Sequence, residues 1–153
     1  MVDSDLAQVL ALNQAVVSEL SDLDERRLKW LVSMAALALV VETEGTVLGF
    51  AIAFAPRATY DSVNYRWFSE HFQSFLYLDR IAVLQAHRRR GIGARLYDAA
   101  EAAGAPYGRV VCEVNVQPPN PASLAFHKSR GYRELDQLEH DGGKVVTLLA
   151  KLV

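Results

Sequence analysis

Apolar residues recur along the chain with two spacings: every three to four residues in some stretches, and alternating or continuous in others. The first spacing is typical of amphipathic helices and the second of sheet strands. Asp22 or Asp24 can cap the second helix. Asn120, followed by Pro121, can begin the last helix, which Gly131 would end. The predicted elements, in chain order, are helices at 6–20 and about 22–35, a hairpin of strands 36–42 and 47–55, a strand at 75–83, a helix at 91–103, a strand at 109–116, a helix at 121–130 and a closing hairpin of strands 132–139 and 144–152.

This order of elements predicts an α/β fold with a strand-helix-strand crossover between residues 75 and 116. The chain has 153 residues, of which 51% are apolar, and this is enough to form one buried core. We therefore expect a single domain spanning residues 1–153.

Net charge and cysteine content limit the expected binding partners and cellular compartment. The net charge is -2 and the pI is about 6.1, so the overall field recruits neither nucleic acid nor an acidic membrane surface. The single cysteine, Cys112, lies in an apolar run and suits a reducing compartment. No leader pattern begins the sequence, and no apolar run reaches the ~20 residues that span a bilayer. We expect a cytoplasmic protein.

Basic residues and glycines meet where a strand gives way to a helix. The run 88–90 consists of three arginines, and Gly91 and Gly93 stand at the start of the following helix. The first amides of a helix lack partners and carry partial positive charge, and glycine lets an anion approach them closely. The segment therefore predicts a site for a phosphate-bearing cofactor.

Two familiar phosphate-binding motifs fit this segment poorly. A P-loop would need Gly-Lys-Ser/Thr, which is absent. A dinucleotide fingerprint needs a small residue where Leu96 stands, and seven residues (84–90) separate Val83 from Gly91. Glu113, about 20 residues further on, keeps the dinucleotide alternative open.

A pair of motifs carries a family resemblance. The chain reads Arg88-x-x-Gly91-x-Gly93-Ala94 after the strand LDRIAV, and later NPASLAFHKSRGY. This combination resembles the acyl-CoA N-acyltransferases of the GNAT superfamily. The resemblance implies a single-domain GNAT-like α/β fold, with a mixed central β-sheet and helices on both faces.

The resemblance also implies the cofactor, acetyl-CoA (coenzyme A), and how it is held. Loop amides would bind the pyrophosphate, and the central strand would splay from its parallel neighbour so that its backbone pairs with the pantetheine arm. No metal is expected. The implied cofactor-binding residues are Ile81, Ala82, Val83, Arg88, Arg89, Arg90, Gly91, Ile92, Gly93, Ala94, Asn120, Ser123 and Phe126.

The implied reaction is transfer of an acetyl group from acetyl-CoA to a primary amine by direct attack. Because an alkylamine is mostly protonated at neutral pH, a carboxylate or a water relay has to remove a proton. Asp79 matches the position where related enzymes often carry an acidic residue, and Glu113 is the reserve carboxylate. The alternative for Asp79 is a surface ion pair with Arg80 or Arg133.

One position departs from the family pattern. Where the family usually has a tyrosine that protonates the departing thiolate, this chain has His127. A charged imidazole could donate a proton, so we expect His127 to be the general acid. The alternative is an exposed helix residue or a cofactor contact.

The acceptor is expected to be a small-molecule or peptide amine. The irregular segment 56–74 carries Tyr60, Tyr65 and Trp67, which together with Glu113 are the candidate substrate residues. The alternative is that a short helix in this segment covers the core with its aromatic side chains.

Two further alternatives stay open. The family commonly begins with a strand that has no counterpart here, so either it is missing or the start is truncated, and a partner chain in a homodimer would then pair with the sheet edge. The protein could also be a catalytically weak CoA-binding or sensing module or, as a third hypothesis, a dinucleotide-dependent oxidoreductase.

Overall fold

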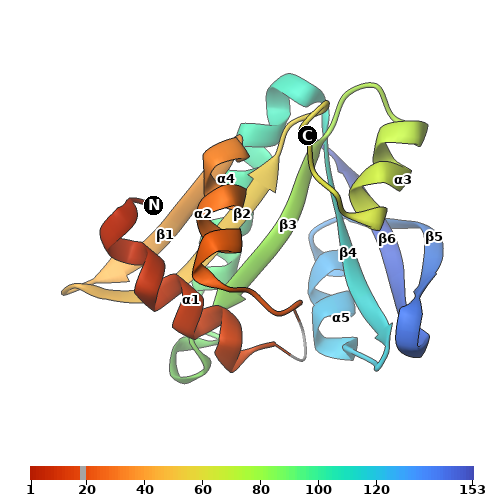
Figure 1. The fold of residues 1–153 in the computed structure, drawn as a ribbon. Coiled ribbons are helices and arrows are strands. Elements are labelled where there is room, and N and C mark those ends of the chain that lie inside the picture. The colour runs from red at the N-terminus through yellow and green to blue at the C-terminus, as the bar shows by residue number, and fades with distance from the viewer. Residues whose placement is uncertain (18–19) are drawn as a thin grey trace.

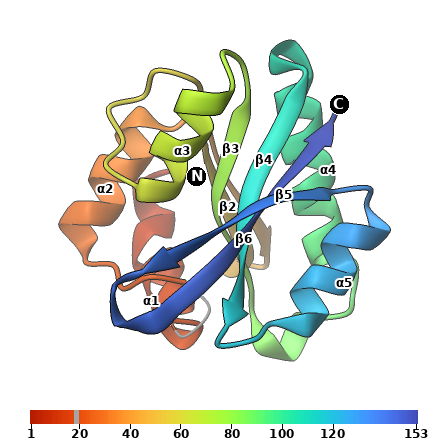
Figure 2. The ribbon, with the colours of Figure 1, turned by 90° about the vertical axis from the view of Figure 1, so that its right-hand side faces the viewer.

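A mixed β-sheet of six strands lies at the centre of the protein, with helices on both of its faces (Figures 1 and 2). The computed structural model describes residues 1–17 and 20–153. The strands are β1 (Leu37–Thr43), β2 (Thr46–Phe54), β3 (Leu76–Val83), β4 (Arg109–Gln117), β5 (Arg133–His140) and β6 (Lys144–Leu152). The α-helices are α1 (Leu6–Ala15), α2 (Glu25–Met34), α3 (Val63–His71), α4 (Ile92–Gly104) and α5 (Pro121–Ser129). The α/β fold expected from the sequence is confirmed.

Most element ends agree with the capping residues. The Asp24 carboxylate accepts the amide of Arg27 at the start of α2, and the Asn120 side chain accepts the amide of Ser123 at the start of α5. The first helix is shorter than predicted, because α1 ends at Ala15; residues 18–19 of the predicted helix lie outside the described residues.

The strands follow the order β1-β2-β3-β4-β6-β5. All neighbouring pairs are antiparallel except β3 and β4, which α4 connects in parallel. The closing hairpin turns back on itself, so its second strand, β6, pairs with β4 and leaves β5 at the edge. The sheet is therefore mixed, as the implied fold requires.

Two hydrophobic cores sandwich the sheet. In Figure 2, α1, α2 and α3 lie on one side of it and α4 and α5 on the other. Phe50 and Tyr77 pack into the first core, whereas Ala51 and Leu78 pack into the second with Leu96 of α4. Because successive strand residues face opposite sides, a central strand such as β2 is apolar at nearly every position.

The parallel pair at the centre of the sheet is short. β3 and β4 pair only at Leu76↔Val110 and Tyr77↔Val111, although the two strands have eight and nine residues. Beyond these residues the strands diverge, which is the splay that the family resemblance implied. One side of the second half of β3 is thus left without a strand partner in the described part of the chain.

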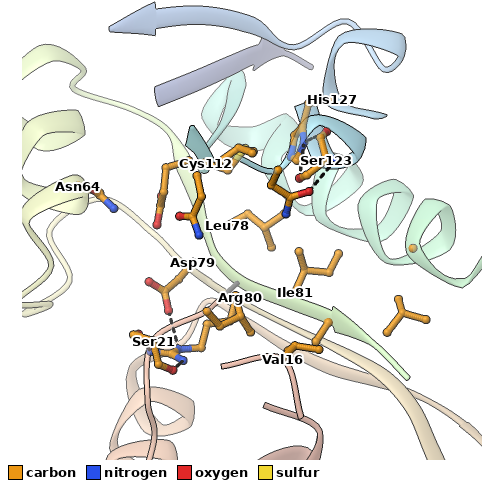
Figure 3. A pocket seen from close by; sticks show the side chains of 18 of the residues that line it. Val16, Ser21, Asn64, Leu78, Asp79, Arg80, Ile81, Cys112, Ser123 and His127 are labelled. Atoms are coloured by element: carbon orange, nitrogen blue, oxygen red, sulfur yellow. Dashed lines mark hydrogen bonds and ion pairs between the residues drawn. The ribbon is translucent and has the colours of Figure 1, made fainter. Parts of the chain in front are cut away.

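A β-bulge in β3 lies at the point where β3 and β4 have separated. Ile52 of β2 pairs with Arg80, but the next residue, Ala53, pairs with Leu78, so Asp79 is the extra residue. A bulge places two consecutive side chains on the same face of a sheet. Asp79 and Arg80 accordingly both point toward the α1–α2 side, while Leu78 and Ile81 lie on the other side (Figure 3).

The segment before β1 matches the expected absence of a first strand. Within 1–17 and 20–36 the structure has a 3-10 turn (Asp3–Asp5) and the helices α1 and α2, but no strand. The amino group of Met1 donates to the carbonyl of Ala38 at 3.1 Å. Among the described residues, no helix has the length and apolar character needed to cross a membrane.

Candidate active site

A cavity of about 800 Å³ occupies the opening between β3 and β4. Its lining residues come from the α1–α2 connection, α2, the segment before α3 with the start of α3, the middle of β3, the β3–α4 connection with the first turns of α4, the second half of β4, α5 with the residue before it, and the β5–β6 connection. We call the part beside α4 and α5 the cofactor end. The part beside Asp79, Glu113 and the segment before α3 is the acceptor end.

The start of α4 forms a cradle suited to an anion at the cofactor end. Gly91, the N-cap, has a φ of 80°, which favours glycine, and no side chain of the described residues caps the helix there. A Cβ on Gly91 would have no neighbour within 4 Å, and one on Gly93 would meet only Val83 Cγ2 at 3.9 Å. Protein packing therefore does not explain the glycine at 93, whereas an anion close to the helix amides would.

The arginines beside this helix start are exposed, and two of the three face the cavity. Arg88 and Arg89 line it, while Arg90 does not. The Nε of Arg88 contacts the carbonyl of Val83 at 3.4 Å. Arg89 has a φ of 60°, a conformation that non-glycine residues adopt at a cost of about 1–2 kcal/mol. The β3–α4 loop therefore has a strained backbone at Arg89, a positively charged residue that lines the cavity.

The remaining implied cofactor residues surround the same space, with one exception. Ile81, Ala82 and Val83 line the cavity along the unpaired side of β3, and Ala94, Asn120, Ser123 and Phe126 line it from the helices. Ile92 does not, because its side chain is buried in the core against α4 and β2 neighbours. The side chains and backbone present fit a phosphate-bearing group with a narrow, extended arm.

At the acceptor end, the Asp79 carboxylate lies in a nearly closed environment. Its side chain is 6% exposed, Oδ1 accepts a hydrogen bond from the Tyr60 hydroxyl at 2.7 Å, and Oδ2 lies 3.2 Å from Arg80 Nε. The expected alternative, an ion pair with Arg80, is present, but it is buried and not on the surface. Burial raises the pKa of Asp79, and the Arg80 charge opposes this shift only in part.

Arg80 ties this carboxylate to the α1–α2 connection. Its Nη1 donates to Asn13 Oδ1 and to the Ser21 carbonyl, both at 2.9 Å, and its Nη2 donates to Ser21 Oγ at 2.5 Å. Figure 3 shows Arg80 between Asp79 and Ser21. A buried guanidinium with this many partners fixes the position of the bulge.

Glu113 reaches the acceptor end from β4. Its Oε1 accepts a hydrogen bond from the Tyr77 hydroxyl at 2.9 Å. Its buried Oε2 makes no hydrogen bond of good geometry among the described residues, although the Asn64 side chain is near enough to lower the pKa of Glu113. Burial raises the pKa of Glu113 to about 8, with a smaller contribution from the charge of Asp79. A carboxyl group that titrates near neutral pH beside a cavity can accept a proton there.

His127 is buried and not an exposed helix residue. It is 4% exposed, its Nδ1 lies 2.7 Å from the Ser123 carbonyl, and its Nε2 lies 2.6 Å from the Tyr97 hydroxyl. Burial lowers the pKa of His127, and the nearby Arg130 charge acts in the same direction. The imidazole does line the cavity, but as a neutral ring bonded on both nitrogens.

The predicted aromatic substrate residues separate in the structure. Tyr60 lines the cavity, but Tyr65 and Trp67 do not. The Tyr65 hydroxyl donates to the Ala55 carbonyl and accepts the Ala58 amide, and the Trp67 ring stacks on His71 at 3.7 Å. These two side chains therefore cover the core and hold the segment before α3, which is the alternative considered for them.

Several cavity-lining residues were not anticipated from the sequence. Arg27 and Asp61 form an ion pair at the acceptor end, where Asn64 and His140 share a hydrogen bond of 2.9 Å. No local pattern singles out these residues, because they meet only after the chain folds. Tyr97 is different: it stands four residues after Gly93 on the same helix, and residues at that spacing share a face.

Taken from one end to the other, the cavity offers an anion cradle, an unpaired strand edge and two buried carboxyl groups. Such an arrangement can hold an extended phosphate-bearing molecule along β3 and bring its far end to a proton acceptor.

Comparisons with known proteins agree with this geometry. A model of the acetyltransferase (GNAT) family matches residues 7–132. The fold is similar to that of Ard1 from Thermoplasma volcanium, at 18% identity over 100% of this chain and 94% of that chain, with a TM-score of 0.80. It is also similar to a ribosomal-protein-alanine N-acetyltransferase from Brucella melitensis, at 24% identity over 100% and 97% of the two chains and a TM-score of 0.72.

A third similar structure is an aminoglycoside 6'-N-acetyltransferase complexed with coenzyme A, at 14% identity over 96% of this chain and 89% of that chain, with a TM-score of 0.70. At these identities the structural likenesses show the fold. The family match covers most of the chain and includes the glycine loop and the segment that begins α5. This chain therefore belongs to the acetyltransferase (GNAT) family.

Proposed function

We propose that the protein is an acetyl-CoA-dependent N-acetyltransferase that transfers the acetyl group to a primary amine by direct attack. The observation that carries this proposal is the continuity of the cavity from the helix cradle at Gly91 and Gly93 to the buried carboxyl groups of Asp79 and Glu113. The cofactor seen with the aminoglycoside acetyltransferase supports the choice of coenzyme A.

The acceptor amine enters from the acceptor end of the cavity, opposite Arg88 and Arg89. This end holds Asp79 and Glu113, and its rim carries Asp22 and the Arg27–Asp61 pair. Carboxyl groups favour a cationic amine on arrival, and one of them has to take a proton before the nitrogen can attack.

The two carboxyl groups have different parts in the proposal. Asp79 already accepts from Tyr60 and faces Arg80, so it fixes the local charge and the Tyr60 ring. Glu113 has one oxygen that makes no hydrogen bond of good geometry among the described residues, and burial raises its pKa to about 8, so it takes the proton from the attacking amine. Bound acetyl-CoA would supply the thioester, and the β3 backbone from Ile81 to Val83 would orient it.

A second candidate function, a CoA-binding or sensing module with weak catalysis, is favoured by one observation. His127 stands where the family usually has its proton-donating phenol, and this imidazole is neutral and bonded on both nitrogens. The dinucleotide hypothesis gains no such support: Leu96, where a fingerprint would have a small residue, is a fully buried core residue.

The test has two stages. In the first, thermal unfolding is followed with acetyl-CoA or with NADH; we expect stabilisation by acetyl-CoA alone. In the second, release of CoA thiol is measured with a panel of small amines and peptides. Stabilisation without turnover on any acceptor would favour the binding module, and no stabilisation by acetyl-CoA would contradict both functions.

Three expectations from the sequence stay predictions: a single domain over 1–153, a cytoplasmic location, and a homodimer that pairs the sheet edge. Analytical ultracentrifugation measures the last of these directly.

A further inference from the structure

We propose that Asn64 of α3, held in one orientation by His140, is a positioning residue for Glu113, and that its amide NH2 donates a hydrogen bond to the ionised carboxylate. This inference rests on the proposed function, in which Glu113 takes the proton from the attacking amine. It gives a part in the reaction to two residues that no sequence motif marks. It also joins α3, β4 and the end of β5 at the acceptor end of the cavity.

The three side chains meet because their elements face one another. Val111 of β4 lies in the first core and Leu138 of β5 packs against it, on the side of the sheet where α3 lies (Figure 2). Successive strand residues alternate between the two faces, so Glu113 and His140, each two positions further on, point to that same side. Asn64, Glu113 and His140 all line the cavity.

Asn64 comes from the first turn of α3, where the backbone is held by a cap. The Ser62 side chain accepts the amide of Tyr65 at 3.3 Å, and Asn64 stands between these two residues with only 7% of its surface exposed. Figure 3 shows Asn64 on the same side of the opening as Asp79, away from His127. A buried amide on a fixed backbone has to find its hydrogen-bond partners among the groups beside it.

His140 determines which way the Asn64 amide points. Asn64 Oδ1 lies 2.9 Å from His140 Nε2, and because an amide oxygen can only accept, Nε2 is the donor. Asn64 Nδ2 is then the atom that is left for the other neighbour, Glu113. The reverse orientation would set Oδ1 against the Glu113 carboxylate, where two acceptors repel each other. The bond to His140 therefore keeps a donor turned toward Glu113.

The Glu113 carboxylate lacks a donor at one of its two oxygens. The Tyr77 hydroxyl donates to Oε1 at 2.9 Å, whereas the buried Oε2 makes no hydrogen bond of good geometry among the described residues. A buried charged oxygen without a donor costs free energy, and the Asn64 amide is the group near enough to supply one. With Nδ2 bound, each oxygen has one donor, and Oε2 keeps a lone pair for the proton of the amine.

The groups around Glu113 act on its ionisation in both directions. Burial raises the pKa of Glu113 to about 8 and the charge of Asp79 adds to this rise, whereas Tyr77, Asn64 and Lys144 lower it. By element, the titratable and charged groups that face Glu113 are Asp79 and Tyr77 of β3 and Lys144 of β6, with His140 of β5 acting through Asn64. Replacing Asn64 removes a hydrogen bond without changing any of these charges.

The first experiment compares Asn64→Leu with Ser69→Ala. Leucine is close to asparagine in size but has no donor, and Ser69 is an exposed polar residue of the same helix that does not line the cavity. In Asn64→Leu the rise of kcat/KM with pH should move up by about one pH unit. This shift lowers kcat/KM by about tenfold at pH 7 and much less near pH 10. Ser69→Ala should follow the parent protein at every pH.

The pH profile separates positioning from two other roles of Asn64. A residue that only stabilised the fold would lower kcat/KM by the same factor at every pH. One that only contacted the acceptor would raise the acceptor KM and leave the midpoint of the profile where it is. Either result in Asn64→Leu would overturn the proposal.

The part of His140 is tested by His140→Gln and His140→Leu. Glutamine places an NH2 group near the position of Nε2 and leucine does not, so only His140→Gln keeps a donor for Asn64 Oδ1. We expect His140→Leu to lower kcat/KM at pH 7 by about threefold through a smaller upward shift of the same midpoint, and His140→Gln to stay closer to the parent. Equal midpoints in the parent and both variants would overturn the part assigned to His140.

A measurement without acceptor or cofactor separates this proposal from the proposed function. The side-chain carboxyl carbon of Glu113 is followed by NMR against pH in isotope-labelled parent and Asn64→Leu, and its signal is assigned by its loss in Glu113→Gln. The pKa of Glu113 should be about one unit higher in Asn64→Leu. Equal values would overturn the role of Asn64 alone. A raised value in a protein that acetyl-CoA does not stabilise would support the hydrogen bond and contradict the proposed function.

Discussion

The two ends of the cavity are built in different ways. The cofactor end comes mostly from one stretch of chain, the second half of β3 with the loop and helix start that follow, and it relies on backbone groups and exposed arginines. The acceptor end is assembled from side chains of the α1–α2 connection, α2, the segment before α3, β3, β4 and the β5–β6 connection. The charged side chains at its centre, Asp79 and Arg80, are buried.

Because of this difference, we expect cofactor binding and acceptor chemistry to respond to different changes. At the cofactor end the cations are in water, so binding there depends on space, backbone geometry and salt. At the acceptor end burial raises the pKa values of Asp79 and Glu113, so chemistry there depends on pH. Changes that affect one end and spare the other test whether the division is real.

The largest expected effect is at the acceptor end. Glu113→Gln should lower kcat/KM by about 10²- to 10⁴-fold, because it removes the proposed proton acceptor. In the parent, kcat/KM should rise as pH increases through about 8, where Glu113 loses its proton, and the variant should lack this rise. Glu139→Gln, at an exposed position on β5, is the control. An unchanged pH profile in Glu113→Gln would contradict the assignment.

The same substitution has a consequence for stability with a definite sign. Folding raises the pKa of Glu113 from 4.5 to about 8, so between these values the folded state binds more protons than the unfolded state. Stability therefore falls as pH rises through this window. Glu113→Gln should raise Tm relative to the parent at pH 8, and the difference should vanish near pH 4. Calorimetry at both pH values measures it.

At the cofactor end, Gly93→Leu should weaken acetyl-CoA binding by about 10- to 100-fold, since a side chain there enters the cradle. Stability should be unchanged, because a Cβ at this position meets only one atom within 4 Å. Gly104→Ala should behave in the opposite way, because its Cβ would meet a Val110 methyl at 2.4 Å. Isothermal titration and thermal unfolding of both variants would reveal whether the two glycines serve different purposes.

A smaller effect is expected from Arg89→Gly, which should weaken acetyl-CoA about tenfold by removing a cation at the cradle. Because Arg89 has a φ of 60°, glycine should not destabilise the fold. Glu44→Gly relieves a similar conformation, with a φ of 50°, in the β1–β2 turn and should leave affinity unchanged. Equal affinity in both variants would show that Arg89 does not contact the cofactor.

The smallest effect should come from Arg27→Ala. The Arg27 guanidinium pairs with Asp61 and lies 4.1 Å from the Trp30 ring centroid and 5.7 Å from that of Tyr60, whose hydroxyl holds Asp79. We expect about a threefold rise in the acceptor KM, since an exposed pair contributes about 1 kcal/mol or less. The KM for acetyl-CoA should not change. Lys29→Ala, on the same helix, is the control.

The sequence was most informative where local chemistry decides the structure. Asn120 was expected to cap α5 and does so, and the glycine loop stands at the start of α4 as predicted. The bulge at Asp79 was not foreseen, because strand register depends on the partner strand. This bulge places the Asp79 and Arg80 side chains on the same face of the sheet.

The unanticipated residues follow the same rule. Arg27, Asp61, Asn64 and His140 meet through tertiary packing, and nothing in their local sequence marks them. Tyr65 and Trp67 are aromatic residues of a kind that often lines pockets. In the structure, however, two hydrogen bonds of its hydroxyl hold Tyr65 in the fold, and stacking on His71 holds Trp67. Tyr97 could have been found by following the face of Gly93 one turn along α4.

Because β3 and β4 diverge, one side of the second half of β3 behaves like the edge of a sheet although β3 is a central strand. Along Ile81–Val83 the amides alternate between facing β2 and facing the opening, and those that face β2 should exchange with deuterium only slowly. The amides that face the opening have no strand partner among the described residues, so they should exchange within the first time points. If a pantetheine arm lies along them, acetyl-CoA should slow exchange on that alternating set and leave its neighbours unchanged, which makes the strand a built-in reporter of cofactor docking.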